Sequence, residues 1–184
     1  MDTNFLFNGL SIIFSEKALA VYGALVSVIL GYWLRASKQA KSDQLSVDRQ
    51  LYGELHSILP PDSASLEMLA HQDFYDTFAH DNLKPLRESV AWMGRFDKTF
   101  FNNKLEARKA ALHQSLSDFI SAIELISTPV NSTVSTCLPD DESHDFADYS
   151  AETVERLTNV ENLARVSFKR YTELVESAKA QLRV

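Results

Sequence analysis

Glycine is scarce in this 184-residue chain. Only five occur, and three of them, Gly9, Gly23 and Gly31, lie within the first 31 residues. The rest of the chain contains Gly53 and Gly94 alone. Tight turns depend on glycine for backbone conformations that other residues avoid. A fold with many turns is therefore disfavoured, and the composition predicts helices.

Cysteine and basic residues are also in short supply. Cys137 is the only cysteine, so the chain can form neither an internal disulfide nor a thiolate metal cluster of its own. A single thiol fits a reducing compartment. From Ser42 onward, 14 Lys and Arg stand against 23 Asp and Glu. Nucleic-acid binding needs a basic face, so we expect no nucleic acid among the partners.

Sequence patterns that support catalysis are missing. The chain has no phosphate-binding glycine loop, no G-x-S-x-G turn, no H-E-x-x-H helix and no cysteine pair. We therefore expect no enzymatic activity, no catalytic residue and no cofactor. The densest polar cluster comprises His71, Asp73, Asp76, His80 and Asp81. On a helix His71 would face away from His80, so we expect no metal site there.

One long uncharged run stands near the amino terminus. Residues 18–34 read ALAVYGALVSVILGYWL, with Lys17 before and Arg35 after. As a helix they would extend about 25 Å, the short end of a membrane span. Tyr32 and Trp33 fall where an interfacial aromatic belt belongs, and Arg35 can snorkel. The run predicts a transmembrane helix over residues 17–35, the alternative being a buried core helix.

The charges beside this run predict its orientation. Arg35, Lys38 and Lys41 follow it, whereas Lys17 alone precedes it. By the positive-inside rule the carboxyl-terminal side is cytoplasmic and the amino terminus outside. No small-residue cleavage site follows the run, which favours a retained single-pass anchor in the cell (inner) membrane. The apolar tail of residues 1–16 is too short to span and is expected in the interface; a tight hairpin with a second span is the other interpretation.

Small residues recur on one face of the predicted span. Gly23, Ser27 and Gly31 are spaced every four residues, so they stack along the helix. Such a stripe allows two helix backbones to approach closely within lipid. Small residues are also common in membrane helices generally. The stripe predicts self-association into a homo-oligomer.

The soluble part shows helical periodicity. The run after Arg35 meets no proline until Pro60, so the first helix is expected to continue to about Leu59. A short helix capped by Asp62 or Ser63 follows, and Pro85 opens another. Residues 103–127 and 151–182 form two long amphipathic helices. From Leu157 onward the second follows a heptad, which suggests a coiled-coil contact within or between molecules.

The connection over residues 128–150 is polar and turns acidic. Between Pro139 and Glu155 there are seven carboxylates and no basic residue. A linker of this kind is usually a mobile loop; its functional interpretation is a docking site for a basic partner or a divalent cation. Asn131-Ser132-Thr133 matches a glycosylation acceptor, which a cytoplasmic location would leave inert.

These features together predict an all-α protein: an amino-terminal transmembrane helix followed by a cytoplasmic antiparallel helical bundle over residues 36–184. The layout resembles that of membrane-anchored effectors of bacterial toxin and phage-defence systems, in arrangement alone. We expect the lipid bilayer, a second copy of the chain and a cytosolic protein as partners. The first hypothesis is a membrane-perturbing effector, the second a tether that recruits a cytosolic protein, and the third a membrane-bound enzyme.

Overall fold

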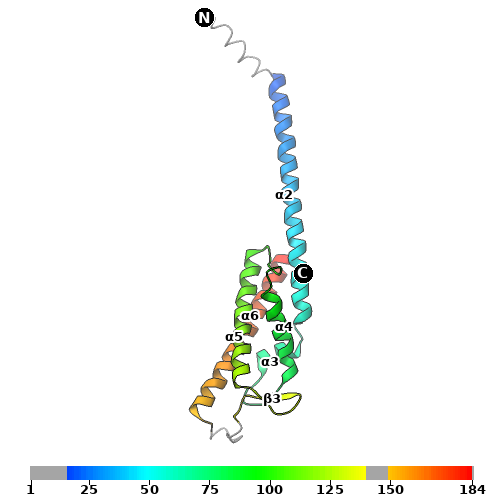
Figure 1. Ribbon diagram of the computed structural model, residues 1–184. Coiled ribbons are helices and arrows are strands. Elements are labelled where there is room, and N and C mark those ends of the chain that lie inside the picture. The colour runs from blue at the N-terminus through cyan, green and yellow to red at the C-terminus, as the bar shows by residue number, and fades with distance from the viewer. Residues whose placement is uncertain (1–15, 140–148, 184) are drawn as a thin grey trace. The chain divides into compact units, whose positions relative to one another are not determined.

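A computed structural model describes residues 16–139 and 149–183, and leaves the side chains of residues 16–25, 28 and 29 outside that description. Helix α2 runs from Glu16 to Ile58 without interruption (Figure 1). The prediction of one helix extending to about Leu59 is therefore confirmed. Pro60 and Pro61 end it, because proline offers no N–H to continue the hydrogen-bonding pattern. The chain forms two compact units, residues 1–44 and 45–184.

Two short helices follow α2. In α3, Ala64–His71, the Ser63 side chain accepts a hydrogen bond from the Leu66 N–H, as an N-cap residue does. The 3-10 turn η1, His80–Asn82, leads into α4, Leu83–Met93. Pro85 lies in the first turn of α4, where a missing N–H costs little. Both helices were expected from their capping residues.

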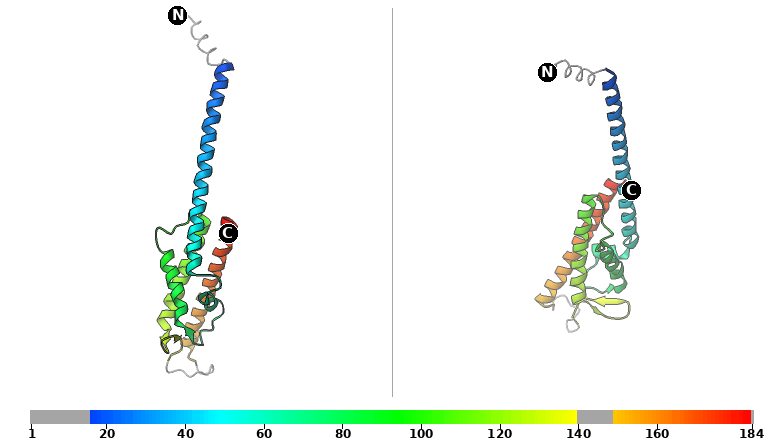
Figure 2. Two further views of the ribbon diagram at one scale, coloured as in Figure 1. Left: turned by 90° about the vertical axis from the view of Figure 1, so that its right-hand side faces the viewer. Right: turned by 45° about the horizontal axis from the view of Figure 1, so that its top comes forward.

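The two long helices of the second unit lie side by side and antiparallel. Helix α5 covers Asn103–Ile126 and α6 covers Ala151–Leu182, close to the predicted bounds. Asn102 and Ser150 cap them through their side-chain oxygens. The heptad positions Leu157, Ala164 and Ala178 of α6 are buried, so this face packs within the molecule. Figure 2 shows α6 running back along α5 in two further views.

Every buried apolar residue of the described chain belongs to the second unit. The core extends from Leu51 on α2 to Leu182 on α6 and includes the fully buried Phe74 and Phe119. Tyr171 of α6 donates a hydrogen bond to the Leu59 carbonyl at 3.0 Å, which joins the end of α2 to α6. No described residue of the first unit belongs to this core, so a fragment of residues 42–184 retains every described core residue.

A small sheet departs from the predicted all-α fold. Strands β1 (Phe78–Ala79), β2 (Thr128–Pro129) and β3 (Val134–Thr136) pair antiparallel in the order β1-β3-β2. Asn131 closes the β2–β3 turn, because its Oδ1 accepts from the N–H groups of Thr133 and Val134. The glycosylation-like triplet is therefore a turn. The expected loop over residues 128–150 begins as a hairpin, and residues 140–148 lie outside the described residues.

Helix α2 contains the residues 17–35 that the sequence predicts to cross a membrane. Within the described part of the chain, no helix is both long and apolar enough to cross a bilayer.

Candidate functional site

The residues predicted to act in the membrane lie on the first half of α2. Of the three small residues of the stripe, Ser27 is exposed and Gly31 is partly exposed. Gly23 lies among the residues whose side chains the structure does not describe. A Cβ atom added at Gly31 would meet no atom within 4 Å. The basic residues Arg35, Lys38 and Lys41 are exposed. The described large apolar side chains of this segment are all more than half exposed: Val26, Leu30, Tyr32, Trp33 and Leu34.

The second half of α2 is fastened to the helical unit by three polar side chains, Asp48, Arg49 and Glu54, which we call the α2 clamp. Asp48 is only 3% exposed. Its two carboxylate oxygens accept hydrogen bonds from the backbone N–H groups of Phe101 at 2.7 Å and Asn102 at 3.0 Å. A buried carboxylate needs such partners, since an unpaired charge in the interior is costly. Asp48 thereby holds the start of α5 against α2.

The other two clamp residues reach α6 and α4. Arg49 donates from Nε to the Leu182 carbonyl at 2.9 Å, in the last turn of α6. Glu54 accepts from Lys98 Nζ at 2.6 Å and from the Trp92 indole N–H at 3.1 Å. Hydrogen bonding to Lys98 lowers the pKa of the Glu54 carboxyl below its ordinary value. Glu54 is therefore held in its charged form at neutral pH.

A second layer supports the segment that Asp48 contacts. Lys109 of α5 is buried and donates to the Lys98 carbonyl at 2.5 Å, and its ammonium lies 2.9 Å from Glu106. The other oxygen of Glu106 accepts from the Phe100 N–H at 2.9 Å. Side chains from α2 and α5 thus hold residues 98–102. The contacts that α2 makes are not visible as a sequence motif, because their partners lie between 38 and 133 residues away.

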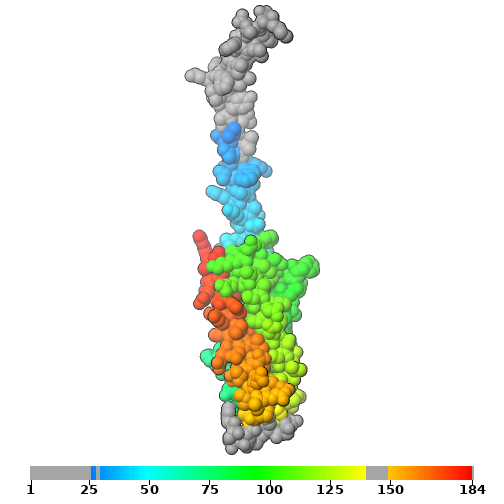
Figure 3. Space-filling model, turned by 90° about the vertical axis from the view of Figure 1, so that its left-hand side faces the viewer, coloured from blue at the N-terminus to red at the C-terminus, as the bar shows by residue number. Residues whose placement is uncertain are grey.

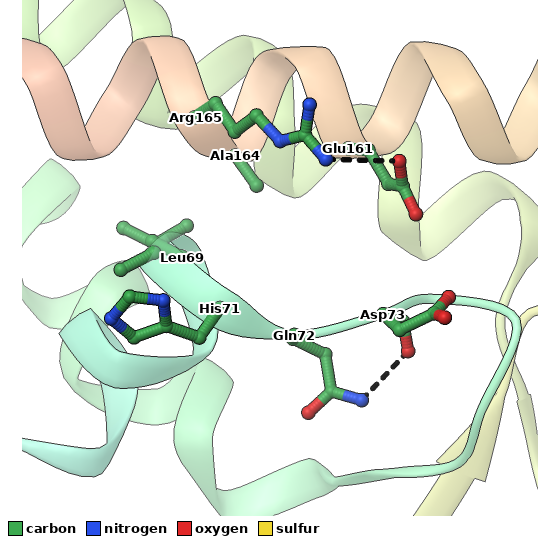
Figure 4. A pocket seen from close by; sticks show the side chains of 8 residues that line it. Leu69, His71, Gln72, Asp73, Glu161, Ala164 and Arg165 are labelled. Carbon is green, nitrogen blue, oxygen red and sulfur yellow. Dashed lines mark hydrogen bonds and ion pairs between the residues drawn. The ribbon is translucent and has the colours of Figure 1, made fainter.

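A polar hollow lies between the end of α3 and α6 (Figure 4). This cavity of about 150 Å³ is lined by Leu69, Ala70, His71, Gln72, Asp73, Glu161, Ala164 and Arg165. Glu161 and Arg165 pair with each other at 3.5 Å on the α6 side. His71 lies on the α3 side and also borders two neighbouring hollows of about 300 and 250 Å³. Figure 4 shows that the side chains drawn around this hollow do not converge on one point.

The polar residues that lie close together in the sequence between His71 and Asp81 do not form one site in the structure. Asp73 Oδ1 accepts from the Tyr75 N–H at 2.9 Å and so closes a turn. His80 begins η1, where its backbone N–H donates to the Thr133 carbonyl. Among the described residues no three His, Cys, Asp or Glu lie close enough together to hold a metal ion.

Cys137 is buried beside the sheet, and burial raises the pKa of its thiol to about 12. We expect iodoacetamide to alkylate it about a thousandfold more slowly in the native chain than an exposed thiol, because the thiolate is the reactive form. The measurement is mass spectrometry over time, with and without urea. A variant carrying Cys137→Ser and Ser132→Cys places the thiol on the exposed turn and should react at once. Equal rates for the two chains would contradict the burial.

Compared with models of known protein families, with curated proteins and with solved structures, the chain matches none.

Proposed function

We propose that the chain is a non-enzymatic, single-pass membrane protein whose helical unit binds a cytosolic partner and whose apolar helix self-associates in the inner membrane. Residues 18–34 would cross the bilayer once, with the amino terminus outside and the helical unit in the cytoplasm. The effector hypothesis adds that partner binding alters how the membrane helices associate.

The observation that carries the membrane assignment is the uncovered apolar surface on α2. Large apolar side chains exposed together over residues 26–34 are unfavourable in water. Lipid would cover them, and the exposed Arg35, Lys38 and Lys41 after them suit the headgroup region.

The α2 clamp favours an effector over a simple tether. The same helix that contains the apolar segment enters the core through Leu51 and Leu55 and is held there by Asp48, Arg49 and Glu54. The effector hypothesis requires that a change in the helical unit passes along α2 to the apolar segment. A tether needs only attachment and would work equally well with a flexible linker.

Topology is tested with reporters fused after Val184. A reporter that is active only in the cytoplasm should give full signal, and one that is active only after export should give none. The reverse result would overturn both the orientation and the cytosolic partner.

Self-association is tested by changing Gly23, Ser27 and Gly31 together to leucine. Larger side chains should keep the helix in the membrane but separate the paired backbones, so crosslinking between chains should fall at least tenfold. Since Gly31 has open space around it within one chain, a loss would report a contact between chains.

The matched control alters the opposite face through Val21→Leu, Leu25→Ile and Val28→Leu, and should leave crosslinking unchanged. Loss of crosslinking in the control alone would show that the small residues are not the interface.

The effector and tether hypotheses predict different results for a flexible insertion in α2. Seven residues of glycine and serine placed between Lys41 and Ser42 would preserve attachment while breaking the helix, and seven residues of helix make nearly two full turns, about 3.6 residues each. An effector should then lose its influence on membrane potential and growth, whereas a tether should still recruit its partner to the membrane. A helical insertion of alanines of equal length is the control.

A further inference from the structure

A groove runs between α3 and α6. The polar hollow at the end of α3 adjoins the hollow of about 300 Å³ beside Phe168 of α6, because both are lined by Ala70 and His71. Figure 4 shows α6 on one side of the first hollow and the end of α3 on the other. Figure 3 shows α6, coloured orange to red, along the surface of the helical unit. We call the two hollows together the α3–α6 groove.

The two ends of the α3–α6 groove differ in chemistry. The hollow beside Phe168 has an apolar wall, in which Leu66 is buried and Ala70 and Phe168 are partly buried. The hollow at the end of α3 is bordered by the carboxylates of Asp73 and Glu161. From Glu161 to Phe168 the helix α6 makes about two turns and advances about 10 Å. The groove thus offers an apolar recess and an acidic recess two helical turns apart.

The charged side chains that line the groove are mostly acidic. Asp62 and Glu67 are exposed beside the apolar hollow, and Asp73 is exposed beside the other. Among the described residues, no lysine, arginine or histidine forms an ion pair with these three carboxylates. The lining contains one arginine, Arg165, whose side chain is 71% exposed although it pairs with Glu161 at 3.5 Å. The groove therefore complements an occupant that is partly apolar and positively charged.

We propose that the α3–α6 groove binds a basic helix of a partner protein. An apolar side chain of that helix would occupy the hollow beside Phe168, and a lysine or arginine about two turns away would enter the hollow beside Glu161. The incoming cation would face Asp73 and Glu161, while the largely exposed Arg165 turns into solvent. The proposal names the partner-binding face of the function proposed above and rests on it for biological meaning. The groove itself does not depend on the membrane assignment.

The test uses the full chain in an uncharged detergent and a fluorescent, alanine-rich helical peptide of about 18 residues, with two leucines one turn apart and a lysine about two turns after each. Anisotropy measures its binding, and micelles without protein give the background. A peptide of the same composition whose lysines lie on the opposite helix face should bind at least tenfold more weakly. A peptide with glutamate in place of lysine should not bind. Equal binding of the rearranged peptide would reduce the interaction to charge attraction and overturn the proposal.

Two variants of the chain place the site in the groove. Ala70→Leu fills the recess that the two hollows share and should weaken peptide binding about tenfold, because the central contact is blocked. Its control is Ala110→Leu, which adds the same side chain at an exposed position of α5 and should have no effect. Glu161→Gln should weaken binding about fivefold and reduce its dependence on salt. Its control is Asp118→Asn, which removes an exposed carboxylate of α5 outside the groove.

Circular dichroism checks that each variant is folded. If folded Ala70→Leu binds the peptide as well as the wild type, the groove is not the site. If Ala70→Leu does not fold, Glu161→Gln decides the question, and an affinity equal to that of Asp118→Asn would overturn the proposal.

A second copy of the chain is the competing occupant. Sedimentation in the same detergent would then show an oligomer that Ala70→Leu dissociates and that persists when Gly23, Ser27 and Gly31 are changed to leucine. This result would overturn the proposal for a partner helix. These outcomes are separate from those of the membrane tests. The peptide can bind a chain whose reporter shows the opposite topology, and a chain with the expected topology can fail to bind the peptide.

Discussion

Replacing Asp48 by alanine is expected to lower the free energy of unfolding of the helical unit by about 2 to 4 kcal/mol, because hydrogen bonds to a charged group contribute more than neutral ones. The change leaves the N–H groups of Phe101 and Asn102 without their carboxylate in a buried setting. Urea unfolding of the fragment of residues 42–184, followed by circular dichroism, measures the loss. The start of α5 should also become more accessible to hydrogen exchange.

Two further variants separate the lost contacts from a general effect of altering α2. Asp48→Asn keeps one acceptor oxygen and should recover part of the loss. Asp43→Ala removes an exposed carboxylate whose hydrogen-bond partner, Gln39, lies outside the fragment, and should change stability by less than about 0.5 kcal/mol. If Asp48→Ala is as stable as Asp43→Ala, the clamp does not hold α5.

Truncation of Phe74 to alanine should have the largest effect, about 3 to 5 kcal/mol, through the cavity it leaves. Phe74 is fully buried, and its ring lies 5.9 Å from that of Phe78 and 5.8 Å from that of Phe119. It therefore connects the strand β1 with helix α5. Urea unfolding of the same fragment is the measurement.

The control for Phe74 is Phe101→Ala. Phe101 is 56% exposed, so its truncation should cost much less even though the same number of atoms is removed. Equal losses for the two variants would show that the cluster of Phe74, Phe78 and Phe119 is not a packed core.

The helices were predictable from the sequence because their signals are local. Asn102 and Ser150 cap α5 and α6, and the apolar spacing within each helix is regular, so their bounds were placed within a residue. The hairpin was missed because residues 128–136 were interpreted by their polarity. The β-branched Thr128, Val134 and Thr136 on either side of Asn131 are the signal that could have predicted it.

The candidate sites also differ in whether their signal is local in the sequence or depends on packing between helices. The stripe of Gly23, Ser27 and Gly31 is a repeat within one helix, so the sequence alone suggests it, and it remains a prediction. The α2 clamp depends on which helices pack together. Asp48 is one acidic residue among many in the sequence, and its burial and its contacts with Phe101 and Asn102 distinguish it.

The hydrogen bond between Tyr171 and the Leu59 carbonyl joins residues 112 positions apart. During synthesis on the ribosome, this contact can form only after Tyr171 has been made. At 5 to 20 residues per second, roughly 6 to 22 s pass between the appearance of the two partners on the ribosome. During that interval Leu51, Leu55 and Leu59 have no α6 to cover them, although the apolar segment before them has already been made. A nascent chain would thus present two hydrophobic surfaces in succession. Under the proposed function, the first would enter the membrane before the second is folded. Chaperone demand should accordingly concentrate in the period before α6 emerges.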